Sequence, residues 1–160
     1  MQAQHQAHLP LAMRDRHYRT LALMAAIHFV AMYVLMYAMV DSVRQVVPNS
    51  NNLYMAGLMT SPMLLMEVVL MRSMYPDRRK NAVVIGAGLI LLISAFAAIR
   101  SQALVGDVQF LKSMIPHHSG AILMCREGSL SDPRVLSLCR AIVDSQKREI
   151  EEMETLLDSL

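Results

Sequence analysis

The 160-residue sequence contains no Trp, few other aromatic residues and only two Cys. The shortage of aromatic side chains argues against a surface that stacks nucleic-acid bases. Two Cys are too few for a disulfide framework. Charged residues make up 18% of the chain and hydrophobic residues 54%, which excludes a disordered chain and a nucleic-acid-binding tail. Methionine is the residue in excess, with 15 copies.

Three long apolar segments dominate the first hundred residues: residues 20–40, 53–71 and 82–99. The first carries no charge and is long enough to cross a hydrocarbon core of ~30 Å. The third carries Gly86 and Gly88, which suit close helix packing. The rest of the chain is too short to cover all three segments. We therefore expect an all-α protein in a lipid bilayer, with a cytoplasmic tail (1–19), a three-span membrane domain (20–100) and a helical-hairpin domain (101–160).

The distribution of basic residues predicts the orientation of the spans. Seven Arg and Lys residues lie before the first span or between the second and third, against three on the opposite side. Under the positive-inside rule, the N-terminus is cytoplasmic. Three crossings then place residues 101–160 outside the cytoplasm. We expect a bacterial inner-membrane protein with a periplasmic C-terminal domain.

Residues 107–127 and 132–158 read as two helices joined by a short turn. Asp132 suits the N-cap of the second helix, and Pro133 suits its first helical position. A single hairpin encloses little core by itself. A homodimer, or a higher homo-oligomer, would complete a four-helix bundle.

The first hairpin helix combines thioether, imidazole and thiol groups. At ~100° per residue, Met114, His118 and Cys125 share one stripe, and His117 and Met124 share the adjacent stripe. The facing helix can add Cys139 or Met153. Such soft donors select Cu(I) and its congener Ag(I). The alternative is that Met and Cys at this spacing only fill the core.

The hairpin also carries a family resemblance. The pattern is Asp107-x-x-Phe110-x-x-x-Met114-Ile-Pro-His117-His118-x-x-Ala121-Ile-x-Met124, followed by Asp132-Pro and Gln146-x-x-Glu149-Ile-x-x-Met153. It resembles membrane-anchored members of a bacterial domain-of-unknown-function family that has a ferritin-like fold and includes the periplasmic copper-binding protein CopM. The resemblance implies copper or silver binding in metal tolerance. The residues that match the family pattern are Met114, His117, His118, Met124 and Met153.

This chain departs from that family by its single hairpin and by its two cysteines. With a turn near residue 130, Cys139 would lie opposite residue 121, one turn from Cys125. An intrachain disulfide is then awkward, because its Cα atoms must lie within ~7 Å; an intermolecular bond stays open. We expect no di-iron centre, since no Glu stands three residues before either hairpin His.

The first two spans each carry a strip of methionines. Their matched spacing allows a relay of weak Cu(I) sites, or flexible packing between helices. Glu67, an acid within a span, is a functional candidate that could pair with His28 or Arg72. His5, His8 and His17 in the tail could capture metal or be incidental. The relay candidates are His28, Met32, Met36, Met39, Met55, Met59, Met63, Met66 and Glu67.

The sequence offers no catalytic grouping, so we expect a protein that is not an enzyme. The leading hypothesis is a Cu(I)- and Ag(I)-binding membrane protein in copper homeostasis or tolerance, which could exchange the ion with periplasmic copper-handling proteins. A second is a Cu(I) transporter that uses the methionine strips as a conduit. A third is a membrane scaffold without metal.

Overall fold

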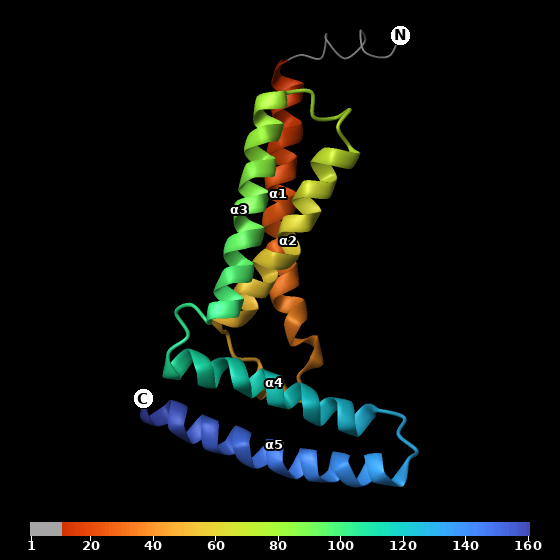
Figure 1. Ribbon diagram of the computed structural model, residues 1–160, viewed down its shortest axis with the longest axis vertical. Coiled ribbons are helices and arrows are strands. Elements are labelled where there is room, and N and C mark those ends of the chain that lie inside the picture. Colours follow the sequence, from red (N-terminus) through yellow and green to blue (C-terminus); the bar gives the residue numbers. More distant parts are fainter. Residues whose placement is uncertain (1–10) are drawn as a thin grey trace. The chain divides into compact units, whose positions relative to one another are not determined.

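The computed structural model describes the backbone of residues 11–160 and the side chains from residue 16 onward. All regular secondary structure in this part of the chain is helical, as expected (Figure 1). The elements are α1 (Leu11–Leu35), η2 (Met36–Met39), η3 (Val43–Gln45), α2 (Ser50–Leu70), α3 (Arg78–Ser101), α4 (Asp107–Glu127) and α5 (Pro133–Ser159).

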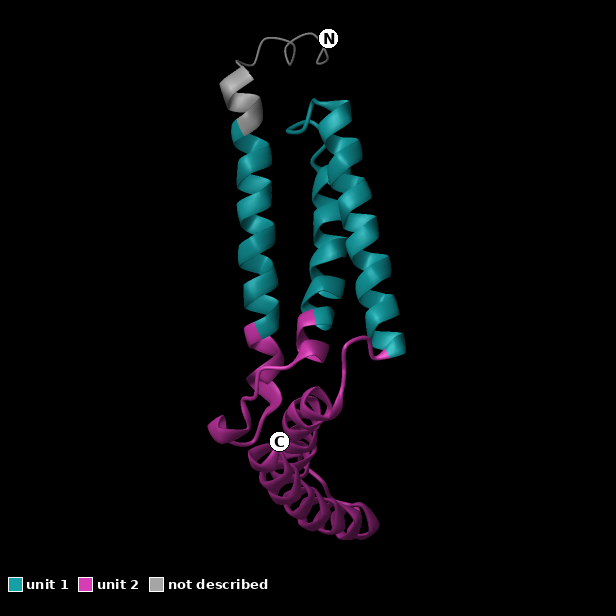
Figure 2. Ribbon diagram, turned by 90° about the vertical axis from the view of Figure 1, so that its left-hand side faces the viewer, with its two compact units in different colours: residues 1–33, 54–101 teal, residues 34–53, 102–160 magenta. Residues whose placement is uncertain are grey.

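The chain divides into two compact units, shown in different colours in Figure 2. The first contains the described residues up to 33 together with residues 54–101, and the second contains residues 34–53 and 102–160. Residues 34–53, which belong to the expected membrane domain, share more contacts with the C-terminal hairpin than with the rest of that domain.

Three helical stretches are long and apolar enough to cross a membrane: Arg16–Met39, Ser50–Leu70 and Arg78–Ser101. They contain the apolar segments expected from the sequence, except that residues 40 and 71 lie just outside. Pro62 lies inside α2 without ending it. The length and composition of these helices indicate a membrane-associated protein.

Small residues let α2 pack closely within the first unit. Its buried positions include Ala56, Gly57, Thr60 and Ser61. The hydroxyl groups of Thr60 and Ser61 donate hydrogen bonds to backbone carbonyls one turn earlier in the same helix, so both are paired despite their burial. On α3, a Cβ atom at Gly88 would lie 3.0 Å from the side chain of Leu65. Close packing was also expected at Gly86, but that position faces open space.

Tyr18 on α1 and Tyr75 in the connection between α2 and α3 hold these two segments in contact. The rings of Tyr18 and Tyr75 lie 5.3 Å apart, and Tyr75 is 4% exposed. The Tyr18 hydroxyl donates to Oδ1 of Asn81 at 2.7 Å, and the Asn81 amide donates to the carbonyl of Tyr75. The Asp77 carboxylate accepts hydrogen bonds from the first backbone N–H groups of α3, which caps that helix.

In the second unit, α4 and α5 form an antiparallel hairpin, which confirms the expected helices of 107–127 and 132–158 to within one residue. The Asp132 side chain accepts a hydrogen bond from the backbone N–H of Arg134 at 2.8 Å, as expected of an N-cap. The core residues of the hairpin recur at alternating intervals of four and three residues, which is the spacing typical of helices packed side by side. Its buried residues are Leu111, Ile115, Ile122, Ile150 and Met153.

Residues 34–53 cover another face of α4. The Ser119 hydroxyl donates to Oε1 of Gln45 and accepts from the backbone N–H of Asp41, both at 2.6 Å. A Cβ atom at Gly120 would lie 3.4 Å from the carbonyl oxygen of Met39, so glycine permits this close approach. Arg126 forms an ion pair with Asp41 at 2.7 Å. Residues 34–53 of the same chain thus pack on a face of α4 that α5 does not cover.

Candidate metal centre

His118 occupies a core position of the hairpin. It lies between Ile115 and Ile122 in the four-three pattern of α4, and it is 9% exposed. Its Nδ1 atom lies 3.2 Å from Oε2 of Glu149 on α5. The geometry is nevertheless not that of a hydrogen bond, and this buried nitrogen has no hydrogen-bond partner among the described residues. Buried nitrogen atoms are rarely left unpaired. His118 is therefore suited to a ligand held between the two helices.

The register of the hairpin brings two thioethers alongside this pair. Met114 precedes His118 by one turn on α4, and Met153 follows Glu149 by one turn on α5. Because the helices are antiparallel, the same register that pairs His118 with Glu149 pairs Met114 with Met153. Met153 is 8% exposed, and Met114 packs against the apolar cluster that contains it. We call these four residues the hairpin box.

The environment of His118 lowers the pKa of its imidazole, which favours the neutral form. Burial lowers its pKa below the usual value, the nearby carboxylate of Glu149 raises it, and the neighbouring His117 lowers it. Burial is the largest of these effects. A neutral imidazole is the form that binds metal ions. The other carboxylate oxygen of Glu149 accepts a hydrogen bond from the Ser145 hydroxyl at 2.6 Å, which orients the carboxylate.

Two of the residues expected from the sequence lie away from the hairpin box. His117 is exposed, and its ring centroid lies 6.1 Å from that of His118. Met124 is 61% exposed. Both residues share the stripe next to the buried one, as their helical positions predicted. The structure therefore does not bring them together with Met114, His118 and Met153.

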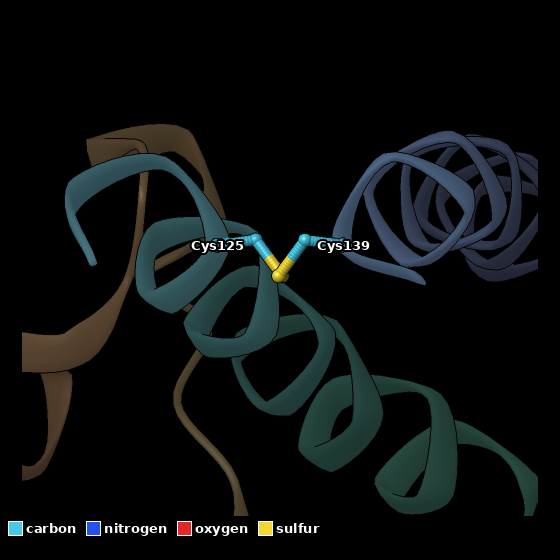
Figure 3. Close-up of a disulfide and its surroundings, with 2 residues drawn as sticks. All are labelled: Cys125 and Cys139. Atoms are coloured by element: carbon cyan, nitrogen blue, oxygen red, sulfur yellow. A yellow bond between two sulfur atoms is a disulfide. The ribbon is translucent and has the colours of Figure 1, made fainter. Parts of the chain in front are cut away.

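Cys125 and Cys139 form an intrachain disulfide (Figure 3). The Cα atoms of the two residues are 5.4 Å apart, so the expectation that this bond is awkward was wrong. The turn itself, residues 128–132, lies near residue 130 as expected, but the two helices are offset along each other, so that Cys139 lies opposite Cys125 and not opposite residue 121. The difference moves each pairing by one helical turn. While the disulfide is intact, neither sulfur is available as a thiolate ligand.

The relay candidates of the first two spans are not buried. Met39, Met59 and Met66 are 54%, 46% and 55% exposed, and the other methionines of the two strips have intermediate exposure. Glu67 accepts a hydrogen bond from the Tyr75 hydroxyl at 3.2 Å, and it forms no ion pair with His28 or Arg72, all of which are described. His17 is half-buried on α1, and His5 and His8 lie outside the described residues.

Within residues 16–160, no three side chains of His, Cys, Asp or Glu come together in a way that could hold a metal ion. A centre in the hairpin therefore needs the thioethers to complete its ligand set. Glu149 is the member of the hairpin box that the sequence reasoning missed as a ligand. Its signal was present, since Glu149 and Met153 on the second helix repeat the four-residue spacing of Met114 and His118 on the first.

Fold and site together define a membrane-associated, all-helical protein with a C-terminal hairpin that carries clustered Met, His and Glu side chains. Comparison with known proteins agrees with the expected link to a family of unknown function: the domain of unknown function DUF305 matches residues 93–157. The uncharacterized protein L153 of Acanthamoeba polyphaga mimivirus is 37% identical over 139 residues, which cover 85% of this chain and 90% of that protein. The chain belongs to the same family as this mimivirus protein. No solved structure matches the chain.

Proposed function

We propose that the hairpin binds Cu(I), with Ag(I) as a surrogate ion, and serves copper homeostasis or tolerance. The observation that carries this proposal is the buried, unpaired Nδ1 atom of His118, with a carboxylate 3.2 Å away. His118 would supply a nitrogen ligand, and Met114 and Met153 would supply thioethers. Glu149 would offset the charge of the ion.

The donor set favours a soft monovalent ion over harder cations. Thioethers bind Cu(I) and are poor ligands for Mg²⁺ or Ca²⁺. A structural zinc site needs four ligands drawn from thiolate, imidazole and carboxylate groups. The hairpin box holds one imidazole and one carboxylate, and the remaining two donors are thioethers. This composition supports copper over zinc.

The same proposal places the protein in a bacterial inner membrane with the hairpin in the periplasm. Two observations support this placement. Most basic residues lie before the first span and between the second and third spans, which the positive-inside rule assigns to the cytoplasmic side. The Cys125–Cys139 disulfide is typical of an oxidising compartment. The hairpin would exchange Cu(I) with periplasmic copper-handling proteins, and further copies of this chain would associate with it as a homo-oligomer.

An anaerobic Cu(I) competition titration against a chromophoric chelator tests the proposal. The full chain in detergent is compared with His118→Ala and with the matched control His117→Ala. Loss of His118 should weaken binding by more than the ~10–100-fold typical of outer-shell partners, because it removes a ligand. Loss of the exposed neighbour His117 should leave the affinity unchanged. Equal effects of the two substitutions would sink the proposal.

The transport alternative makes a separate prediction, which concerns the methionine strips. Since Met59 and Met66 are about half-exposed, a conduit would have to form between copies of the chain. Replacing both by Leu preserves their volume and their apolar character. A binding protein would keep its Cu(I) affinity and would show no flux into vesicles either way. A conduit would keep its affinity and lose its flux.

A further inference from the structure

A hollow lies beside the disulfide at the turn end of the hairpin. It has a volume of about 320 Å³ and is open to solvent. Its walls include both sulfur-bearing residues, two apolar side chains and two charged ones. The lining residues are Cys125, Leu136, Cys139, Arg140, Val143 and Asp144.

The two cysteines are held opposite each other by rigid elements. Cys125 belongs to α4 and Cys139 to α5, their Cα atoms are 5.4 Å apart, and the apolar core of the hairpin continues along both helices beyond them. The core residues Ile122 and Val143 belong to the next layer of that packing. Two thiols produced by reduction would therefore remain facing each other, next to the hollow.

We propose that the reduced pair is a second site for a soft monovalent ion, and that the disulfide is its closed, metal-free form. The proposal rests on the affinity for soft ions proposed above, but it uses none of the four residues of the hairpin box. The hairpin would then hold one site that is always available and one that depends on the redox state of its cysteines.

Opening the second site requires a reductant, for which we name a dithiol protein of the thioredoxin class. One of its thiolates attacks a sulfur of the Cys125–Cys139 bond and forms a mixed disulfide, and its second thiol then displaces the chain. The reductant leaves as a disulfide. The two electrons and two protons that it gives up convert the Cys125–Cys139 disulfide into two thiols. Binding of Cu(I) or Ag(I) releases both protons and forms two metal–sulfur bonds.

The surroundings of the pair favour this class of ion. Two thiolates around one monovalent ion carry a net charge of −1, and the guanidinium of Arg140 on the hollow offsets it, although Asp144 opposes this effect. Leu136 and Val143 supply the apolar part of the lining of the hollow. Monovalent coinage metals are satisfied by two thiolates, whereas Zn²⁺ needs four ligands. The described residues supply no third His, Cys, Asp or Glu to such a cluster.

The test is an anaerobic titration of the full chain in detergent with Cu(I), before and after reduction and removal of the reductant. The reduced protein should bind an extra equivalent of Cu(I) and show an ultraviolet thiolate-to-copper charge-transfer band. Equal stoichiometry in both states, with no such band, would overturn the proposal. The Cys125→Ser/Cys139→Ser variant should behave as the oxidised protein does.

Two further variants separate this proposal from that of the hairpin box. His118→Ala should lose the affinity of the box and keep the charge-transfer band after reduction. If the band disappears with His118→Ala, the cysteines do not form a separate site. Arg140→Gln should weaken binding at the reduced pair by about two- to fivefold, and the exposed Arg148→Gln should not. Should the serine variant unfold, wild type alkylated after reduction takes its place, with helicity checked by circular dichroism.

Discussion

Nδ1 of His118 and Oε2 of Glu149 face each other at 3.2 Å across the hairpin, yet the imidazole nitrogen has no hydrogen-bond partner among the described residues. A buried imidazole nitrogen without a hydrogen-bond partner, beside a carboxylate, is suited to hold a cation. The four-residue spacing on both helices places a thioether next to each member of this pair. The proposed metal site therefore consists of one polar pair, His118 and Glu149, and one pair of thioethers, Met114 and Met153.

The carboxylate of Glu149 should contribute charge as well as position. We predict that Glu149→Gln weakens Cu(I) binding about tenfold, because the amide keeps the shape but loses the negative charge. Glu152→Gln, an exposed change on the same helix, is the matched control and should have no effect. Competition titration measures both. An unchanged affinity in Glu149→Gln would remove Glu149 from the site.

The thioether of Met153 should matter for metal binding and little for folding. Met153→Leu conserves volume, so the free energy of unfolding should change by less than about 1.5 kcal/mol. Cu(I) affinity should nevertheless fall, since one sulfur ligand is lost. The exposed Met124→Leu should change neither quantity. If Met153→Leu binds Cu(I) as wild type does, Met153 serves only as core.

The disulfide should stabilise the hairpin by restricting the unfolded chain. It joins residues 14 positions apart, and a loop of that size predicts about 3 kcal/mol. We predict that Cys125→Ser/Cys139→Ser lowers the free energy of unfolding of the hairpin by about this amount. Chemical denaturation followed by circular dichroism checks it. A variant as stable as wild type would show that packing alone fixes the register.

Tyr75 should remain a neutral phenol to unusually high pH. Burial, the charge of Glu67 and the hydrogen bond to Glu67 raise the pKa of Tyr75 from 10.0 to about 12. Because this pKa is higher in the folded state, the stability that it contributes is complete below pH 10 and is lost as the pH rises toward 12.

Alkaline titration of phenolate absorbance tests this assignment in wild type and in Tyr75→Phe. The difference between the two titrations should show a tyrosine that ionises late, near pH 12. A difference curve centred near the ordinary value of 10.0 would contradict the burial of Tyr75 against Glu67.

Local chemistry was enough to predict the helices of the hairpin. Asp132 and Pro133 set the start of α5, and helical spacing placed Met114 and His118 on one stripe of α4, next to that of His117 and Met124. The pairing between the helices could not be read in the same way. The helices are offset along each other, so that the cysteines meet directly although the turn, residues 128–132, lies where it was expected.

Other contacts left no periodic signal in the sequence. Residues 34–53 attach to α4 through individual polar contacts, such as that between Ser119 and Gln45, which no hydrophobic pattern encodes. Glu149 is a different case, because it precedes Met153 by four residues, as Met114 precedes His118. Its half-exposed position nevertheless resembles that of the other acids on α5, so its distance to His118 was needed to identify it.

X-ray absorption of the Cu(I)-loaded protein tests the central claim most directly, because it reports the atoms bound to the ion. The cysteines are kept oxidised, so that any sulfur ligand must be a thioether. The account predicts a mixed shell of sulfur and nitrogen scatterers, which loses sulfur in Met114→Leu/Met153→Leu and loses the imidazole signal in His118→Ala. A shell of nitrogen and oxygen alone in wild type would contradict it.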